Sequence, residues 1–86
     1  MDPWDDFRVF LAVARQESLS AAGRALRIDP ATVGRRVARL EQRLGQPLFA
    51  KSPHGYALTD AGQRLLPHAE QAEQATQGAV EALAGA

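Results

Sequence analysis

The segment from Asp29 to Gly45 constrains the fold of this chain more than any other. Asp29 followed by Pro30 is a typical helix start, an N-cap with proline at the first helical position, and Gly45 is a typical helix end. At about 100° per residue the apolar side chains between them fall within one narrow arc: Val33, Val37, Leu40 and Leu44. The sequence therefore predicts a helix over 30–44 with one buried stripe and a polar outer face.

The outer face of this helix is composed of small and basic residues. The side chains opposite the apolar arc are Ala31, Arg35, Ala38, Arg39 and Gln42, with Thr32 and Arg43 on one flank. Residues 20–54 carry seven Lys or Arg and only two Asp or Glu, although the net charge of the whole chain is zero. The ends of the chain are acidic, through Asp2, Asp5, Asp6, Glu70, Glu73 and Glu81. A basic middle between acidic ends is typical of a localised polyanion site, but charge alone leaves an ordinary solvated face equally open.

Two shorter helices are predicted before this one. Apolar residues recur at spacings of three and four in Phe7, Phe10, Leu11 and Ala14, which predicts an amphipathic helix over 5–16. A second helix is expected over 21–26, capped by Ser18 or Ser20. A tight connection at 27–29 then leads into the third helix.

A hairpin and a long helix are predicted after it. The runs 48–51 and 56–58 have the composition of short strands, and a turn at 52–55 joins them. Thr59 is expected to cap a final helix towards the C-terminus. Pro67 lies inside that helix and removes one backbone hydrogen bond, so a kink or a weakened turn is expected there.

This order of elements predicts a mainly α fold. The expected architecture is a winged helix-turn-helix with a three-helix core and a two-stranded wing, followed by a long C-terminal linker helix. The expected division is a DNA-binding unit over 1–58 and a linker and dimerisation helix over 59–86. With 86 residues, the chain is long enough for one small domain but not for two.

The third helix has the residues that duplex DNA recognition requires. Ala31 and Gly34 are small, which would let the helix backbone enter the major groove, and Thr32 and Arg35 supply donors for base edges. Three further arginines lie towards the flanks, where phosphates are the expected partners: Arg36, Arg39 and Arg43. The alternative is that these arginines only solubilise a packed helix, with Glu41 as a nearby counter-charge.

The linker helix carries an apolar stripe too long for so small a core to cover. The stripe consists of Leu65, Leu66, Ala69, Ala72, Val80 and Leu83. An exposed stripe of this kind favours a homodimer through the same helix of a second copy. The alternative is that the helix packs only on the first helix and frays beyond about Ala75.

Several short motifs together resemble a known family over residues 5–66. They are Ser18-Leu19-Ser20-Ala21-Ala22, Leu40-Glu41, Leu44-Gly45, Leu48-Phe49, Leu58-Thr59 and Ala61-Gly62. This pattern is similar to the N-terminal domain of LysR-type transcriptional regulators. The resemblance implies a dimeric winged helix-turn-helix protein that binds inverted-repeat promoter sites on double-stranded DNA. The absence of cysteine fits a reducing cytosol, so a cytoplasmic location is expected. The resemblance further implies a larger effector-binding domain beyond the linker, so that a small-molecule effector would bind only through a part that this chain lacks.

The resemblance also implies DNA-contacting positions near the start of the third helix and on the wing. Together with the reasoning above, the candidate DNA-binding residues are Ser20, Pro30, Ala31, Thr32, Gly34, Arg35, Arg36, Arg39, Lys51 and His54. The family commonly has Ser-Gln-Pro where this chain has Asp29, Pro30 and Ala31, and serine at Gly34. Arginine is usual where Lys51 and His54 stand. The bases that the family usually prefers are therefore not expected to apply to this chain.

Other functional classes lack the residues they need. The chain has no cysteine, and no histidine–carboxylate cluster has metal-ligand spacing, so neither a metal nor a cofactor is expected. The serines have no histidine and acid partners, so an enzyme is not expected. No apolar run approaches the roughly 18 residues that span a bilayer, and residues 1–4 do not resemble a signal peptide, which predicts a soluble protein without a membrane partner. The remaining alternative to DNA binding is a helical protein-interaction module.

Overall fold

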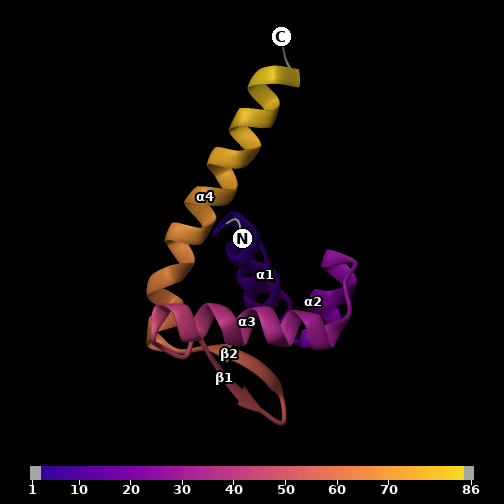
Figure 1. Cartoon of the computed structure of the whole chain (residues 1–86), viewed down its shortest axis with the longest axis vertical. Helices are drawn as coiled ribbons and strands as arrows, with labels where there is room; N and C mark the ends of the chain where they lie inside the picture. The colour runs from indigo at the N-terminus through magenta and orange to yellow at the C-terminus, as the bar shows by residue number, and fades with distance from the viewer. Residues whose placement is uncertain (1–2, 85–86) are drawn as a thin grey trace.

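The computed structural model describes residues 3–84, so Asp2 lies outside the described part. The elements are α1 (Pro3–Gln16), α2 (Leu19–Leu26), α3 (Pro30–Leu44), β1 (Phe49–Ser52), β2 (Gly55–Leu58) and α4 (Asp60–Ala84). In Figure 1, α3 crosses α1, the β1–β2 hairpin lies beside α3, and α4 extends away from the rest of the chain. The predicted winged helix-turn-helix with a long C-terminal helix is confirmed.

Local capping hydrogen bonds explain where the helices begin and end. The Ala31 N–H donates to Asp29 Oδ2 at 3.1 Å, and Gly45 ends α3 in the left-handed region with φ 74°, so both predicted ends of α3 are confirmed. The Ala21 N–H donates to Ser18 Oγ at 3.1 Å. Ser18 rather than Ser20 is therefore the cap, and α2 begins two residues earlier than predicted, at Leu19.

The wing and α4 are joined through Thr59. Its Oγ1 accepts the Gly62 N–H at 3.1 Å, which confirms the predicted cap of α4, and donates to the Pro47 carbonyl at 2.7 Å. The Thr59 N–H donates to the Leu48 carbonyl at 3.0 Å. Pro67 lies inside α4 without ending it, since the helix continues to Ala84.

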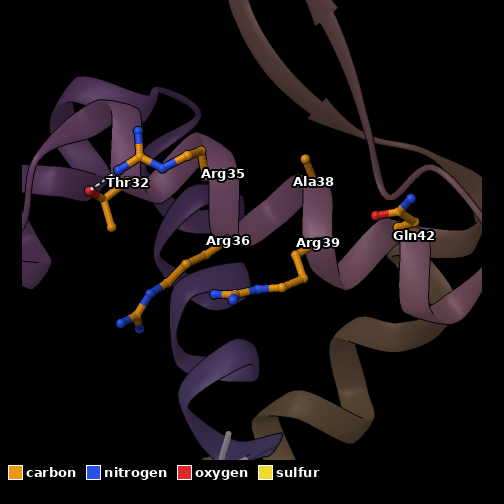
Figure 2. A pocket seen from close by; sticks show the side chains of 6 residues that line it. All are labelled: Thr32, Arg35, Arg36, Ala38, Arg39 and Gln42. Carbon is orange, nitrogen blue, oxygen red and sulfur yellow. Dashed lines mark hydrogen bonds between the residues drawn. The ribbon is translucent and has the colours of Figure 1, made fainter.

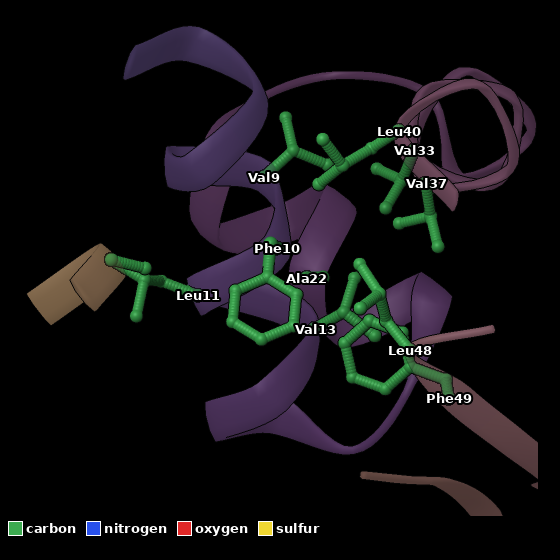
Figure 3. Close-up of a cluster of buried hydrophobic side chains, with 11 residues drawn as sticks. Val9, Phe10, Leu11, Val13, Ala22, Val33, Val37, Leu40, Leu48 and Phe49 are labelled. Atoms are coloured by element: carbon green, nitrogen blue, oxygen red, sulfur yellow. The ribbon is translucent and has the colours of Figure 1, made fainter. Parts of the chain in front are cut away.

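The core is built around α1. Four of its side chains are at most 1% exposed: Val9, Phe10, Leu11 and Val13. Figure 3 shows Phe10 among the buried side chains, with Leu11 directed towards α4. The Phe10 and Phe49 rings lie 5.4 Å apart, which brings the first wing strand into the same core.

The helix α3 contributes most of its predicted apolar stripe to this core. Val33, Val37 and Leu40 are buried, as predicted. Leu44, which was expected in the same stripe, is 47% exposed. Its neighbour Arg43 pairs with Asp6 at the start of α1.

The helix α4 is packed along its first half and exposed along its second. Leu65 and Leu66 are half-buried against the core, and Ala69 is fully buried. Ala69 therefore lies in the interior of its own chain and not on the free face expected for a dimer contact. Residues 74–84 remain helical and are all exposed, although the alternative prediction had the helix fraying beyond about residue 75.

A two-pronged ion pair joins the end of α1 to the middle of α4. The Arg15 guanidinium donates to both carboxylate oxygens of Glu73, at 2.7 and 2.8 Å. These hydrogen bonds lower the pKa of the Glu73 carboxyl and raise the pKa of Arg15 from their ordinary values. The pair is partly exposed to solvent, so its contribution to stability is small.

Two glycines of α4 give opposite predictions for the same substitution. A Cβ on Gly62 would lie 2.3 Å from the Leu48 carbonyl oxygen, whereas a Cβ on Gly78 would meet nothing within 4 Å. We expect Gly62→Ala to lower the free energy of unfolding by about 1–3 kcal/mol because the wing must move away from α4. We expect Gly78→Ala to raise it by about 0.5–1 kcal/mol through helix propensity. Urea denaturation of both variants measures the difference, and a loss of equal size in both would contradict the close packing at Gly62.

The Arg15–Glu73 pair predicts a pH-dependent contribution to stability. Because the folded-state pKa of Glu73 is lowered, the contribution is present above the ordinary carboxyl pKa of 4.5 and is lost as the pH falls through the lowered value. We expect Glu73→Gln to cost less than about 1 kcal/mol at neutral pH and nothing at strongly acidic pH. Urea denaturation at the two pH values, with the remote Glu81→Gln as control, tests this. If Glu73→Gln still lowered the free energy of unfolding at strongly acidic pH, Glu73 would act through packing instead of charge.

Candidate nucleic-acid interface

The exposed side of α3 forms a shallow groove lined by three arginines, two uncharged polar residues and one alanine. The groove has a volume of about 600 Å³ and is lined by Thr32, Arg35, Arg36, Ala38, Arg39 and Gln42 (Figure 2). Asp29 and Pro30 place the start of α3 at the surface, and Ala31 at its first turn is exposed. The structure thus brings the predicted small residue and the predicted donors of this helix to one accessible surface.

The arginines of α3 point in different directions. Arg35 donates to Thr32 Oγ1 at 2.9 Å, so the two predicted base-reading donors lie together at the start of the helix. Figure 2 shows the side chains of Arg36 and Arg39 extending side by side below that pair. The surface therefore has a hydrogen-bonded donor pair in one place and two extended cations in another.

Gly34 has a different neighbour from the one expected. It was predicted to let the helix backbone approach DNA, but a Cβ at this position would lie 3.3 Å from Leu19 Cδ1 of α2. Gly34 is half-buried and faces the preceding helix. Its small size therefore serves the packing of α2 on α3, and its approach to DNA stays a prediction.

Arg43 is not a free flanking cation as predicted. Its guanidinium pairs with Asp6 Oδ2 at 2.5 Å, and Asp6 is only 2% exposed. Asp6 Oδ1 is also buried, with no hydrogen-bond partner within the described residues. The pair joins the C-terminal end of α3 to the start of α1, so Arg43 helps to orient the helix while its side chain remains 50% exposed. Its contact with phosphate stays a prediction.

Glu41 is also a structural residue and not a counter-charge for the arginines. Its Oε2 accepts the N–H groups of Leu48 and Phe49 at 2.7 and 3.3 Å. The carboxylate thereby connects α3 to the first strand of the wing. Sequence reasoning missed this role, although the spacing of Leu40-Glu41 and Leu48-Phe49 in the family resemblance contained the signal.

The wing presents its two candidate residues to solvent. Lys51 in β1 pairs with Tyr56 in the antiparallel register and is exposed. His54 is exposed in the turn, where its N–H donates to Ser52 Oγ at 3.2 Å. Ser20 is exposed near the start of α2. These residues lie on separate elements from the α3 groove, and none of their side chains is buried.

The charge of the α3 groove is not neutralised within the chain. Among residues 3–84, three arginines are held by carboxylates, and these are Arg8, Arg15 and Arg43. Arg35, Arg36 and Arg39 form no ion pair in that range. Because they lie on one turn-and-a-half of helix, their positive charges add at the surface.

The described residues contain neither a metal site nor a membrane-spanning helix. No group of three or more His, Cys, Asp or Glu side chains between residues 3 and 84 could hold a metal ion. Over the same range, no helix has both the length and the apolar character needed to cross a membrane.

Known proteins similar to this chain are regulators of transcription. The chain is 38% identical over 66 residues to the HTH-type transcriptional activator IlvY of Salmonella typhimurium, and 45% identical over 65 residues to the activator AmpR of Providencia stuartii. These matches cover 77% and 76% of this chain but only 22% of each activator. The chain thus corresponds to less than a quarter of their length.

Solved structures share the fold over nearly the whole chain. A mutant of OxyR from Corynebacterium glutamicum with hydrogen peroxide bound matches with a TM-score of 0.92 at 26% identity, covering 100% of this chain and 28% of that one. The CbnR DNA-binding domain in complex with DNA matches with a TM-score of 0.84 at 29% identity, covering 99% of this chain and 98% of that one.

The family model that matches the chain covers most of the winged helix-turn-helix. It is described as the bacterial regulatory helix-turn-helix protein, lysR family, and it matches residues 4–63. The similar proteins are regulators and not enzymes, in agreement with the prediction that this chain is not an enzyme. The chain belongs to the LysR family of bacterial regulatory helix-turn-helix proteins.

Proposed function

We propose that this chain is the DNA-binding region of a LysR-type transcriptional regulator and that it binds double-stranded DNA through α3. The observation that carries the proposal is the uncompensated positive charge of Arg35, Arg36 and Arg39 on an accessible helix surface. Phosphate contacts supply most of the affinity of proteins for duplex DNA. The DNA complex of the similar CbnR domain supports the same use of this fold.

The start of α3 is the part of the chain proposed to read bases. Ala31 and Pro30 are small enough at the first turn to let the helix approach the floor of the major groove. Arg35, held beside Thr32 at 2.9 Å, has the planar donor pair that fits the O6 and N7 atoms of guanine. Gly34 contributes by keeping α2 close to α3.

Phosphate contacts are assigned to cations and donors that surround this reading surface. Arg36 and Arg39 extend from α3 towards one side, and Lys51 and His54 extend from the wing. Ser20 near the start of α2 is a further donor to the backbone. Such contacts set the register of the domain on the duplex but carry little sequence information.

We infer that the working form is a homodimer on an inverted-repeat promoter site. The proposed division is a DNA-binding unit over 1–58 and a dimerisation helix over 59–86. Val80 and Leu83 are 63% and 85% exposed on α4, and exposed apolar side chains favour burial against a second copy. Leu65, Leu66 and Ala72 are half-buried and can add to that contact at their exposed edges.

Two further properties of the intact regulator follow from this proposal. It acts in the cytoplasm, where bacterial DNA is found. Any small-molecule effector would bind to a region beyond the 86 residues described by this sequence, since the α3 groove is the proposed DNA surface and is open to solvent.

Arginine substitutions on α3 test the proposed roles. A preferred site is first selected from a random duplex library. We expect Arg35→Ala to cost about 1–3 kcal/mol of discrimination between that site and random duplex, because a bidentate base contact is lost. We expect Arg39→Ala to weaken binding to both duplexes equally and to reduce the slope of log affinity against log salt by about one. Fluorescence anisotropy at several salt concentrations measures both effects.

The control for the arginine experiment is Arg8→Ala. This change removes the same charge from α1, where Arg8 pairs with Asp5 at 3.5 Å, outside the proposed interface. Arg8→Ala should leave the discrimination between the selected site and random duplex unchanged. Unaltered binding in both Arg35→Ala and Arg39→Ala would exclude α3 from the DNA interface, and no binding by the unchanged chain would favour a protein-interaction module instead.

An acidic substitution on α4 tests the proposed dimer. We expect Leu83→Glu to raise the dimer dissociation constant by about tenfold or more, because a carboxylate is costly to bury without a partner. Gln74→Glu introduces a carboxylate on a different side of the same exposed helix and should have little effect. Sedimentation equilibrium measures both. Equal dimerisation of both variants would exclude the Leu83 side of α4 from the interface.

A further inference from the structure

Glu17 occupies a backbone conformation that does not suit its side chain. It lies between α1 and α2 with φ 58°, in the left-handed region that glycine adopts most readily. Sterically strained residues of this kind are found disproportionately at functional sites. The position therefore raises the question of what the carboxylate does there.

The backbone of Glu17, and not its side chain, is used by the fold. The Tyr56 N–H of the wing donates to the Glu17 carbonyl at 3.0 Å. Gly55 approaches the same carbonyl so closely that a Cβ would lie 2.3 Å from it. Any residue supplies that carbonyl, and glycine would supply it with less strain. Docking of the wing on the α1–α2 connection therefore does not explain a glutamate.

The side chain of Glu17 is exposed beside the wing. The residue Glu17 lines a shallow groove of about 170 Å³ together with Ser52, His54, Gly55, Tyr56 and Ala57. The next residue, Ser18, caps α2, whose first turn carries Ser20. No side chain or backbone group among residues 3–84 pairs with the Glu17 carboxylate. Glu17 thus carries an uncompensated negative charge, shares a groove with the proposed phosphate contact His54 and precedes a second one, Ser20, by three positions.

We propose that Glu17 limits the affinity of this domain for the DNA backbone. Its carboxylate repels the phosphates that the wing and the start of α2 approach, because like charges interact across distances below the Debye length of about 8 Å at physiological salt. The inference rests on the proposed DNA binding and adds a residue that opposes it. A single domain then binds weakly, and occupancy depends on two linked domains binding together.

A purely structural role for the carboxylate is the competing explanation. A negative charge near the start of α2 would stabilise that helix through its dipole. Removing the charge would then lower the thermal midpoint of unfolding without raising the affinity for DNA. The two roles therefore predict different changes: the repulsive role predicts a higher affinity for DNA, and the structural role predicts a lower thermal midpoint.

Three variants of the 86-residue chain distinguish the effect of the Glu17 charge from the effect of its backbone strain. Glu17→Gln removes the charge and keeps the strained backbone, and Glu17→Gly removes both. Asp5→Asn removes one negative charge from α1, where Asp5 pairs with Arg8 outside the proposed interface. Each is titrated with a random duplex by fluorescence anisotropy at low and at high salt, and its thermal midpoint is measured by circular dichroism.

The expected result is a gain of affinity confined to position 17. Both Glu17 variants should bind random duplex about three- to tenfold more tightly than the unchanged chain at low salt, with a smaller gain at high salt. Asp5→Asn should bind as the unchanged chain does. Glu17→Gly should also unfold at a higher temperature.

Other results would overturn the inference in recognisable ways. Unchanged affinity of Glu17→Gln, with normal binding by the unchanged chain, rejects the role of Glu17 and leaves the proposed function intact. A gain in Glu17→Gly alone assigns the effect to backbone strain and rejects the charge. A loss of affinity in Glu17→Gln shows that the carboxylate accepts a hydrogen bond in the complex. Absence of any binding by the unchanged chain rejects both proposals.

Discussion

The burial of α1 is the constraint on which the rest of this domain depends. Val9, Phe10 and Val13 are almost completely shielded from solvent because α2, α3, the wing and α4 all pack around one helix. Burial of apolar area is the main favourable term in folding, and a chain of this size has little of it to lose. Each surrounding element therefore offers one apolar side to α1 and keeps its other side free. For α3, that free side is the basic groove.

Charge is distributed in this molecule according to two different uses. Arg15 and Arg43 are held by Glu73 and Asp6, and these contacts fix α4 and the end of α3 against α1. Glu41 fixes the wing to α3 through two backbone N–H groups. The arginines in the middle of α3 have no such partners. Carboxylates thus set the relative positions of α3 and the wing, and the unpartnered guanidinium groups remain for a polyanion.

Much of the fold follows from local sequence signals, and the departures follow from contacts between distant segments. The ends of α3 and the cap at Thr59 were predictable because a cap depends on residues within one turn. The pairing of Arg43 with Asp6 was not, because it joins positions 37 apart in the chain. Periodicity placed Ala69 on an apolar stripe but did not distinguish a contact within the chain from one with a second copy. Gly34 is a similar case, because its position in the sequence did not reveal that it packs against Leu19 of α2.

The division of α4 into a packed half and an exposed half has a mechanical consequence. Residues 74–84 project beyond the Arg15–Glu73 contact as a stiff rod of ~16 Å, at 1.5 Å of rise per residue. A tilt of ~10° about the packed half moves the tip of such a rod by ~3 Å. The angle at which α4 leaves α1 is set by Leu65, Leu66, Ala69 and one solvent-exposed ion pair. A sideways force on the tip of the rod therefore acts through this short contact on the orientation of the whole winged helix-turn-helix.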